Sequence, residues 1–198
     1  MKYVIFGSGG FAKEVIDYVL NDGHEIAAVI STQQFNSAKY SMFSVYPSVP
    51  DNIEHDGYLL GVADSDLKRK FVSENLDKWK TFIHSSVHLS RFATIGRGCI
   101  ICPQAQINGD CIIGNFVTLN NYTLIAHDAT VGDYCTFSPY SGIMGNSSVG
   151  EDCFFGTAAY SIPKIKLGSK IKVSAGSMVR HSYTDECILQ GNPARPRS

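Results

Sequence analysis

The sequence predicts two structural parts, a small Rossmann-like α/β unit over residues 1–82 and a parallel β-helix with a C-terminal extension over residues 83–198. Three observations predict this. An apolar residue recurs every six positions, a glycine recurs every eighteen, and a glycine-rich turn follows a short apolar strand near the N-terminus. The first two are typical of stacked repeats that share one core. The third is typical of a strand–turn–helix start.

The six-residue period runs from residue 95 to residue 179, interrupted only at Ser161. The apolar residues that open the blocks are Ile95, Ile101, Ile107, Ile113, Leu119, Ile125, Val131, Phe137, Ile143, Val149, Phe155, Leu167, Val173 and Val179. The fifth residue of each block is usually small, as at Cys99 and Ala105. No α-helix has a period of six, and simple strand alternation needs no small fifth residue. Three short strands per turn therefore predict a triangular prism.

Glycines mark a second period of eighteen residues, which equals three blocks. They stand at Gly96, Gly114, Gly132, Gly150 and Gly168. Residues eighteen apart are therefore expected to stack in neighbouring coils, about 4.8 Å from each other.

The N-terminal part begins with a predicted strand over 3–6, a helix over 13–20 and a strand over 25–30. Between the first two, Gly7, Gly9 and Gly10 let backbone N–H groups approach an anion at a helix N-terminus. A structural turn explains these glycines equally well. The dinucleotide fingerprint is incomplete, because Ala12 replaces its third glycine.

The remainder of this part is less regular. Ser31 and Thr32 stand where an acidic residue would end the second strand of a dinucleotide site. A loop with a short strand is expected over 33–56 and a strand over 57–63. A helix from about Leu67 to Asn75 can be capped by residues 64–66. The β-helix is expected to begin near His84.

Composition excludes several classes of protein. The 198 residues are 44% hydrophobic and 18% charged, with a net charge of −1, so no global attraction to nucleic acid or anionic lipid is expected. No apolar run approaches the ~20 residues that span a bilayer. No signal peptide is evident at the start, and a cytoplasmic protein is expected. Residues 164–198 carry a local charge of +5, either a solvated face or a site for a phosphorylated ligand.

The six cysteines do not indicate disulfides or zinc ligands. Cys99, Cys111, Cys135 and Cys153 occupy the small inward position. Cys102 does not, and is the one candidate nucleophile among them. We expect no metal, because a histidine zinc site on such a helix needs three converging histidines and only His127 lies in the regular coils.

His127 is the main catalytic candidate. Its column reads Gly109, His127, Gly145, Pro163, so bare backbone leaves room for a ligand beside the imidazole. Asp128 follows and could orient the ring or raise its basicity. A lone histidine is more often structural, and the glycine column and Asp128 are the features that favour a catalytic role.

The whole pattern resembles the NeuD/PglD family of sugar acyltransferases. The resemblance lies in the glycine turn at residues 7–15, the in-phase hexads, the His127–Asp128 pair and the closing segment at residues 191–195. It implies a left-handed β-helix and an acetyl-CoA-dependent acetyltransferase. It also implies a homotrimer with each active site between two neighbouring helices, and a nucleotide-linked sugar on the N-terminal part.

The resemblance also implies roles for individual residues. His127 corresponds to the general base and Asp128 to its acidic partner. Asn120, Gly7, Gly9, Gly10, Ser31 and Thr32 correspond to substrate-binding positions. Gly145 corresponds to the glycine whose N–H meets the thioester carbonyl. Ala175, Gly176, Asn192, Pro193 and Arg195 fall where the family binds coenzyme A. Some members have a second active-site histidine where this chain has Thr136, which suggests that its hydroxyl or the backbone holds the acetyl group.

We expect direct transfer of the acetyl group to the amine of a nucleotide-linked 4-amino-deoxy sugar, without an acyl-enzyme. An O-acetyltransferase acting on sialic acid or a related sugar is the alternative, because amine and alcohol acceptors need the same base and oxyanion donor. A non-catalytic trimeric scaffold is a third reading.

Overall fold

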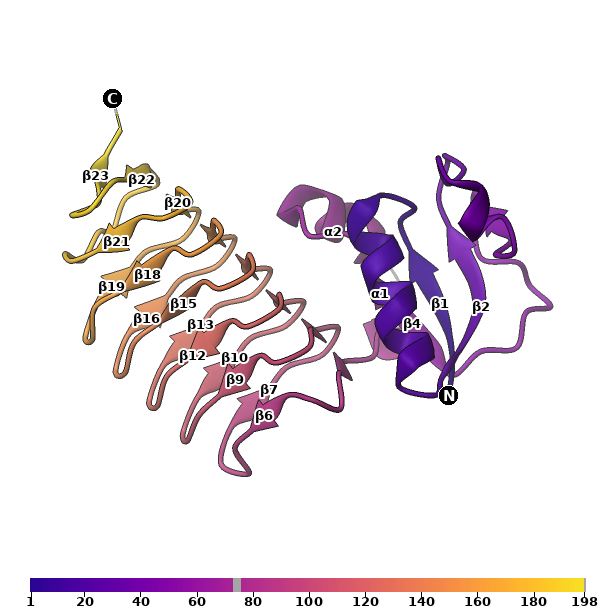
Figure 1. Ribbon diagram of the computed structural model, residues 1–198, viewed down its shortest axis with the longest axis horizontal. Coiled ribbons are helices and arrows are strands. Elements are labelled where there is room, and N and C mark those ends of the chain that lie inside the picture. The colour runs from indigo at the N-terminus through magenta and orange to yellow at the C-terminus, as the bar shows by residue number, and fades with distance from the viewer. Residues whose placement is uncertain (73–75, 198) are drawn as a thin grey trace.

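The computed structural model describes residues 1–72 and 76–197 and confirms the predicted fold class. Figure 1 shows the α/β part beside the first coils of a β-helix, with the C-terminus at the far end. The α/β part contains a parallel sheet in the order β3-β2-β1-β4. Its strands are β1 (Lys2–Phe6), β2 (Glu25–Ile30), β3 (Val45–Tyr46) and β4 (Gly57–Leu60).

Helix α1 (Gly10–Asn21) covers one face of this sheet and begins three residues before the predicted start. Its buried residues Ala12, Val15, Ile16 and Val19 follow the helical repeat. Ile5 of β1 faces α1, since a Cβ on Gly61 would lie 2.9 Å from Ala12 Cβ and 3.0 Å from Ile5 Cγ2. Phe6 therefore points to the opposite face.

Helix α2 (Ser65–Val72) follows β4. Asp64 Oδ1 accepts the backbone N–H of Leu67 at 3.0 Å and caps the helix as predicted. The predicted end of this helix at Asn75 lies outside the described residues. Two 3₁₀ helices, Ala38–Tyr40 and Leu76–Lys78, complete the α/β part. None of the helices in the described ranges is long and apolar enough to cross a membrane.

The β-helix has three sheets, each running along one side of the prism. Sheet 1 contains β5 (Phe82–Ile83), β8 (Ile100–Ile101), β11 (Thr118–Leu119), β14 (Thr136–Phe137), β17 (Phe154–Phe155), β20 (Lys172–Val173), β22 (Ile188–Gln190) and β23 (Arg195–Pro196). Sheet 2 contains β6 (His88–Leu89), β9 (Gln106–Ile107), β12 (Leu124–Ile125), β15 (Gly142–Ile143), β18 (Tyr160–Ser161) and β21 (Met178–Val179). Sheet 3 contains β7 (Thr94–Ile95), β10 (Ile112–Ile113), β13 (Thr130–Val131), β16 (Ser148–Val149) and β19 (Lys166–Leu167).

The register agrees with the predicted period of eighteen. Ile112 pairs with Thr130, and Thr118 pairs with Thr136. The core consists of the opening apolar residues and the small fifth residues. Ser161 keeps the inward position, where its buried hydroxyl accepts the N–H of Met144 at 3.1 Å. The one polar interruption of the pattern therefore has a hydrogen-bonding reason.

From Gly98 to Gly176, each corner of the prism places one residue in the left-handed backbone region. Non-glycine residues do so at Gln104, Asp110, Phe116, Tyr122, Asp128, Tyr134, Tyr140, Asn146, Asp152, Ala158, Lys164 and Lys170. The six-residue spacing shows that the fold imposes this conformation. Asp128, with φ of 58°, is one of the residue types that tolerate it best.

The ends of the β-helix differ slightly from the prediction. Pairing starts at Phe82, which lies opposite Ile100, rather than near His84, and we propose to place the boundary between the two parts just before it. Beyond Val179, β22 still pairs with β20, and β23 adds an antiparallel strand that was not predicted.

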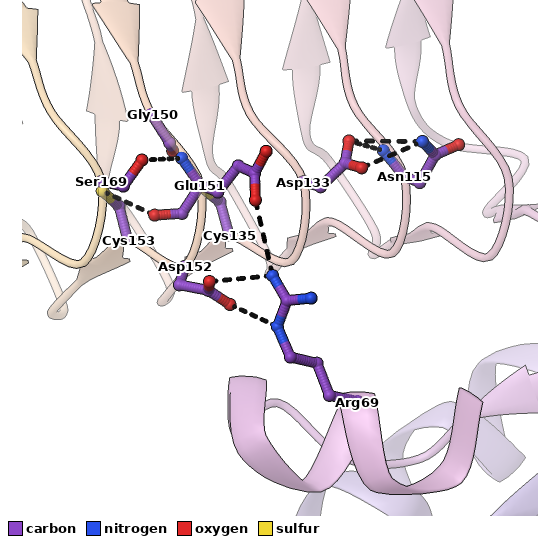
Figure 2. Close-up of polar contacts among 9 residues, drawn as sticks. All are labelled: Arg69, Asn115, Asp133, Cys135, Gly150, Glu151, Asp152, Cys153 and Ser169. Atoms are coloured by element: carbon purple, nitrogen blue, oxygen red, sulfur yellow. Dashed lines mark hydrogen bonds and ion pairs between the residues drawn. The ribbon is translucent and has the colours of Figure 1, made fainter. Parts of the chain in front are cut away.

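The two parts meet where α2 packs on sheet 1, a contact we call the seam. Figure 2 shows Arg69 of α2 reaching the corner that carries Glu151 and Asp152. Its Nε and Nη2 lie 3.1 and 2.9 Å from the two carboxylate oxygens of Asp152. Trp79 packs edge-on against Phe116 with ring centroids 6.2 Å apart. Side chains of the two parts therefore share one hydrophobic cluster.

Candidate active site

His127 lies at the corner between β12 of sheet 2 and β13 of sheet 3. Its Nδ1 lies 2.6 Å from Oδ2 of Asp128. Both side chains are exposed, at 65% and 50%. Because Asp128 accepts the proton on Nδ1, the neutral ring keeps Nε2 unprotonated as a hydrogen-bond acceptor. The sequence predicted the pair, and the fold supplies its geometry through the left-handed conformation of Asp128.

Gly145 lies under the imidazole in the next coil. A Cβ at this position would come within 2.6 Å of His127 Nε2 and 2.7 Å of Cε1, closer than real Cβ contacts occur. The position therefore has to be glycine for the ring to lie where it does. Within the described chain, the N–H of Gly145 donates to no other group, so it remains available to a ligand oxygen.

Asn120 lies at the corner that precedes β12, whereas His127 lies at the corner that follows it. The two residues are therefore at opposite ends of one strand and make no contact within the described chain. The side chain of Asn120 accepts the N–H of Asn121 at 2.8 Å. A single chain does not bring these two predicted site residues together.

The predicted nucleotide loop lies at the carboxyl edge of the parallel sheet, where strand order reverses about β1. Such switch points are the usual ligand sites of α/β sheets. Cβ atoms on Gly9 and Gly10 would meet nothing within 4 Å, so open space lies beside the N-terminus of α1. Gly7 differs, because its φ is +120° and a Cβ there would lie 2.9 Å from a backbone oxygen. Folding alone therefore requires glycine at position 7.

Ser31 and Thr32 follow β2 at the same edge. The hydroxyls of Ser8 and Ser31 lie 2.8 Å apart, and Ser31 Oγ accepts the N–H of Gln33 at 3.1 Å. Thr32 is exposed. The structure therefore ties the loop after β2 to the glycine turn through Ser31, while Thr32 faces solvent.

The predicted coenzyme positions gather at the C-terminal end of the β-helix. The N–H of Gly191 donates to Ser177 Oγ at 2.9 Å, and the N–H of Ala194 donates to the carbonyl of Met178 at 2.8 Å. These bonds hold the closing segment against the corner that contains Ala175 and Gly176. Asn192, Pro193 and Arg195 are exposed there, with a cis peptide between the first two.

The basic residues near the C-terminus do not form one patch. Lys166 lies in sheet 3, Lys172 in sheet 1, and Arg180 follows the last strand of sheet 2. Lys170 and Lys172 share a cleft beside the seam with Arg69, Asp152 and Glu186. The local charge of +5 is therefore divided among three faces of the prism.

Burial decides whether Cys102 can act as a nucleophile. Cys102 is completely buried and packs in the cluster of the α/β part. Burial, with a smaller contribution from Glu14, strongly raises the pKa of its thiol, so a thiolate is unfavourable there. Cys102 is therefore not a nucleophile in this structure. The four inward cysteines are buried as predicted.

The sequence analysis suggested that the hydroxyl of Thr136 or the backbone holds the acetyl group. For the hydroxyl of Thr136 this prediction is wrong. Its hydroxyl donates to the carbonyl of Ala63 at 2.6 Å and accepts from Lys68 Nζ at 2.8 Å. Thr136 is thus a buried part of the seam, on a different face from His127.

Sequence reasoning missed Lys68. This residue is fully buried, and its ammonium group donates to the carbonyls of Phe116 and Cys135 and to Thr136 Oγ1. Desolvation by burial lowers its pKa from 10.5 to about 8. Lysine in a polar helix normally lies in solvent, so no sequence signal identified it.

Comparisons with known proteins show which family model and which solved structures this chain is similar to. The family model of the bacterial transferase hexapeptide repeat matches residues 110–145. No curated protein matches the chain. A histidine variant of perosamine N-acetyltransferase from Caulobacter crescentus, solved with CoA and GDP-perosamine, is 25% identical. It has a TM-score of 0.90 over 100% of this chain and 97% of its own.

Two further solved structures have the same extent. WeeI from Acinetobacter baumannii AYE is 25% identical, with a TM-score of 0.84 and 100% of both chains covered. The acetyltransferase domain of PglB from Neisseria gonorrhoeae FA1090 is 22% identical, with a TM-score of 0.89 and 99% of both chains covered. The chain is therefore an acetyltransferase of the hexapeptide-repeat class, with the two-part architecture expected of NeuD/PglD-type enzymes.

Proposed function

We propose that this protein transfers an acetyl group from acetyl-CoA to the amine of a nucleotide-linked 4-amino-deoxy sugar. The observation that carries the proposal is the His127 corner, where one ring nitrogen is bound to Asp128 and the other is free above Gly145. Solved neighbours of full length, in complex with CoA and GDP-perosamine, support the choice of donor and of acceptor class.

In this mechanism His127 Nε2 accepts a proton from the sugar amine as its nitrogen attacks the thioester carbonyl carbon. The N–H of Gly145 donates to the carbonyl oxygen as negative charge develops there. The new C–N bond forms, the C–S bond breaks, and His127 can return the proton to the sulfur of the leaving thiol. Asp128 keeps the ring in the required tautomer and stabilises the imidazolium. No residue is acylated.

We assign the diphosphate of the sugar nucleotide to the N-terminus of α1, where Gly9 and Gly10 leave open space. Coenzyme A would bind along the exposed corner of Ala175 and Gly176 and the closing segment of Asn192, Pro193 and Arg195. Asn120, Ser31 and Thr32 would contact the acceptor.

A single chain covers only one side of the proposed site, because His127 is 65% exposed and Asn120 lies at another corner. Both features support a homotrimer in which a neighbouring copy closes the site. Light scattering should give about three times the chain mass of 21.6 kDa. A monomer with full activity would contradict this assembly.

The test is release of coenzyme A, followed as free thiol, with acetyl-CoA and a panel of acceptors. The panel contains UDP-, dTDP- and GDP-linked 4-amino sugars and free sialic acid. We expect turnover with one amino sugar and a loss of about 10²–10⁴-fold in His127→Ala. His88→Ala, an exposed histidine on sheet 2, is the matched control and should retain activity.

Other outcomes would change the assignment. Turnover with sialic acid alone would make the protein an O-acetyltransferase. Activity of His127→Ala within a few-fold of wild type would remove the general-base role. A non-catalytic scaffold would show no turnover and no thermal shift with acetyl-CoA, whereas a ligand at ~100 times its Kd stabilises by roughly 2.7 kcal/mol.

A further inference from the structure

Sheet 2 presents an apolar outer face from β12 to β21. In each strand of this sheet the second residue belongs to the inward column, so the first residue points outward. The outward first residues are Leu124, Gly142, Tyr160 and Met178. Leu124, Tyr160 and Met178 are only half-buried. Figure 1 shows the α/β part beside the first coils, away from these strands.

The other two sides of the prism differ from sheet 2. Phe82 and Ile100, the first outward residues of sheet 1, are already buried in the cluster shared with the α/β part. The outward residues of sheet 3 are mainly polar, with Ile112 as the apolar exception: Thr94, Thr130, Ser148 and Lys166. Exposed apolar patches on soluble proteins mark interaction sites. Sheet 2 is therefore the side of the prism that favours contact with another molecule.

Charge indicates what that molecule is. From Ser90 to Met178 none of the outward residues of sheet 2 is charged, and the first charge beyond them is Arg180. A nucleic acid or a highly charged protein would find no ion pair on this face and would have to desolvate its own charges. A second copy of the chain presents an equally uncharged face, so both surfaces leave water without burying a charge. The face therefore suits self-association.

The two edges of this face carry the site residues that a single chain keeps apart. His127 lies at the corner between sheets 2 and 3, and Asn120 lies at the corner between sheets 1 and 2. Both corners belong to one coil, because β12 joins them. A rotation about an axis parallel to the prism keeps each coil level with the same coil of the next copy. It also turns the His127 edge of one copy toward the Asn120 edge of the next.

The Asn120 edge has side-chain groups that are free to contact a ligand. Tyr122 and Tyr140 stack there, with ring centroids 4.8 Å apart and an angle of 4° between the rings, and they are 49% and 53% exposed. Tyr18 of α1 donates to Asn121 Oδ1 at 3.0 Å and holds this edge in place. In the described structure the amide nitrogen of Asn120 has no partner, because its side chain bonds only through Oδ1. Aromatic rings beside an amide donor suit a sugar ring.

We propose that copies of this chain pack through sheet 2, so that Asn120, Tyr122 and Tyr140 of each copy form the wall opposite His127 of the next. Each active site then takes its general base from one chain and this wall from its neighbour. The inference rests on the proposed function for the identity of the site. It adds the face through which the copies assemble and two tyrosines that contact the acceptor across the interface.

Light scattering on the full chain tests the face. Leu124→Asp puts a charge into the interface, so the mass should fall from about three times 21.6 kDa to that of a single chain. Thr130→Asp is the matched control, because Thr130 is the outward first residue of the next strand, on sheet 3, and its mass should not change. Met178→Asp repeats the test on another coil if Leu124→Asp does not fold. A wild-type single chain, or an unchanged mass in the folded sheet 2 variants, would overturn the proposal.

Mixed trimers test whether the wall acts across the interface. One chain carries His127→Ala, the other carries Asn120→Ala with Tyr122→Ala, and co-expression with two different tags allows purification of trimers that contain both. In every such ring, one of the three sites combines an intact His127 with an intact wall, so coenzyme A release should recover to about one third of wild type. Trimers of two differently tagged His127→Ala chains are the control and should stay inactive. No recovery in the mixed trimers would mean that each site is formed within one chain.

The two experiments separate this inference from the proposed function. Assembly needs no turnover, so a trimer that Leu124→Asp dissociates but that transfers no acetyl group contradicts only the proposed function. An active enzyme whose mixed trimers stay inactive contradicts this inference alone. So does a Leu124→Asp single chain with full activity, or a variant with Asn120→Ala and Tyr122→Ala that turns over as fast as wild type.

Discussion

His127 and Lys68 are both basic side chains held by the same β-helix, and they differ in how many of their polar atoms are paired. The ammonium group of Lys68 has three N–H groups and three oxygen acceptors, all in a fully buried site. His127 has one partner, Asp128, and its Nε2 is open beside Gly145. The first arrangement is complete within the chain, and the second is complete only with a ligand.

The comparison teaches how to separate structural from catalytic polar groups on a repeat fold. Lys68 is buried with every hydrogen bond of its ammonium group satisfied, and this fixes the position of α2 on sheet 1. His127 is exposed, with one ring nitrogen oriented by Asp128 and the other free, so it can still accept a proton from a ligand. Thr136 illustrates the difference, since its place in the sequence suggests chemistry and its contacts belong to the seam.

The largest effect is expected for Thr136→Val. The change removes one acceptor of a buried cation and the donor to Ala63, so the free energy of unfolding should fall by about 2–4 kcal/mol. Turnover of the folded protein should stay within about twofold. Urea denaturation at fixed protein concentration measures the first and coenzyme A release the second.

Thr118→Val is the control for that change, because Thr118 pairs with Thr136 in the next coil and no hydrogen bond of its hydroxyl occurs in the described structure. It should change stability by less than about 1 kcal/mol. A Thr136→Val protein of normal stability but low kcat would instead return Thr136 to the active site.

Gly145→Ala should lower kcat/KM about 10–100-fold, because the new Cβ would lie 2.6 Å from His127 Nε2 and displace the ring. Gly109→Ala adds the same atom two coils earlier, where the nearest other atom is 3.9 Å away, and should be nearly neutral. Steady-state coenzyme A release compares the two. Equal activities would mean that the ring position does not matter.

The lowered pKa of Lys68 should be measurable in the pH dependence of the free energy of unfolding. Its pKa is about 8 in the folded chain, against 10.5 for an ordinary lysine, so between these values the unfolded state binds more protons. The contribution of Lys68 to the free energy of unfolding should therefore rise with pH across this window, by up to about 1.4 kcal/mol per unit.

Cys99 and Cys135, which lie beside Lys68, have raised pKa values in the folded chain, so the ordinary titration of their thiols in the unfolded state also changes stability in this range. The measured quantity is therefore the difference between wild type and Lys68→Met in urea denaturation at several pH values. A difference that stays flat from about pH 7.5 to about pH 10 would mean that Lys68 keeps an ordinary pKa.

Arg69→Met should have the smallest effect, about 0.5 kcal/mol in the free energy of unfolding. Arg69 makes a bidentate pair with Asp152, but its side chain is 44% exposed, and exposed ion pairs contribute little. Added salt should reduce the difference further. A loss above about 2 kcal/mol would show that the seam depends on this pair as strongly as on Thr136.

The sequence alone determined the β-helix. A period of six with small fifth residues, and a glycine every eighteen, admits few other solutions, because each coil repeats the same packing problem as its neighbour. The same columns placed His127 between glycines and beside Asp128 without any tertiary information. The short α/β strands followed in the same way from local apolar runs and turns.

Tertiary structure alone decided the seam and the separation of the basic residues. Lys68 is buried only because sheet 1 offers oxygen atoms to a particular face of α2, and nothing local in Ser65–Val72 indicates that. Lys166, Lys172 and Arg180 are close in sequence yet lie on three sheets, because the chain turns a corner every six residues. The sequence period determines which residues stack in the β-helix. The contacts between the α/β part, which has no repeat, and the β-helix form only when folding brings the two surfaces together.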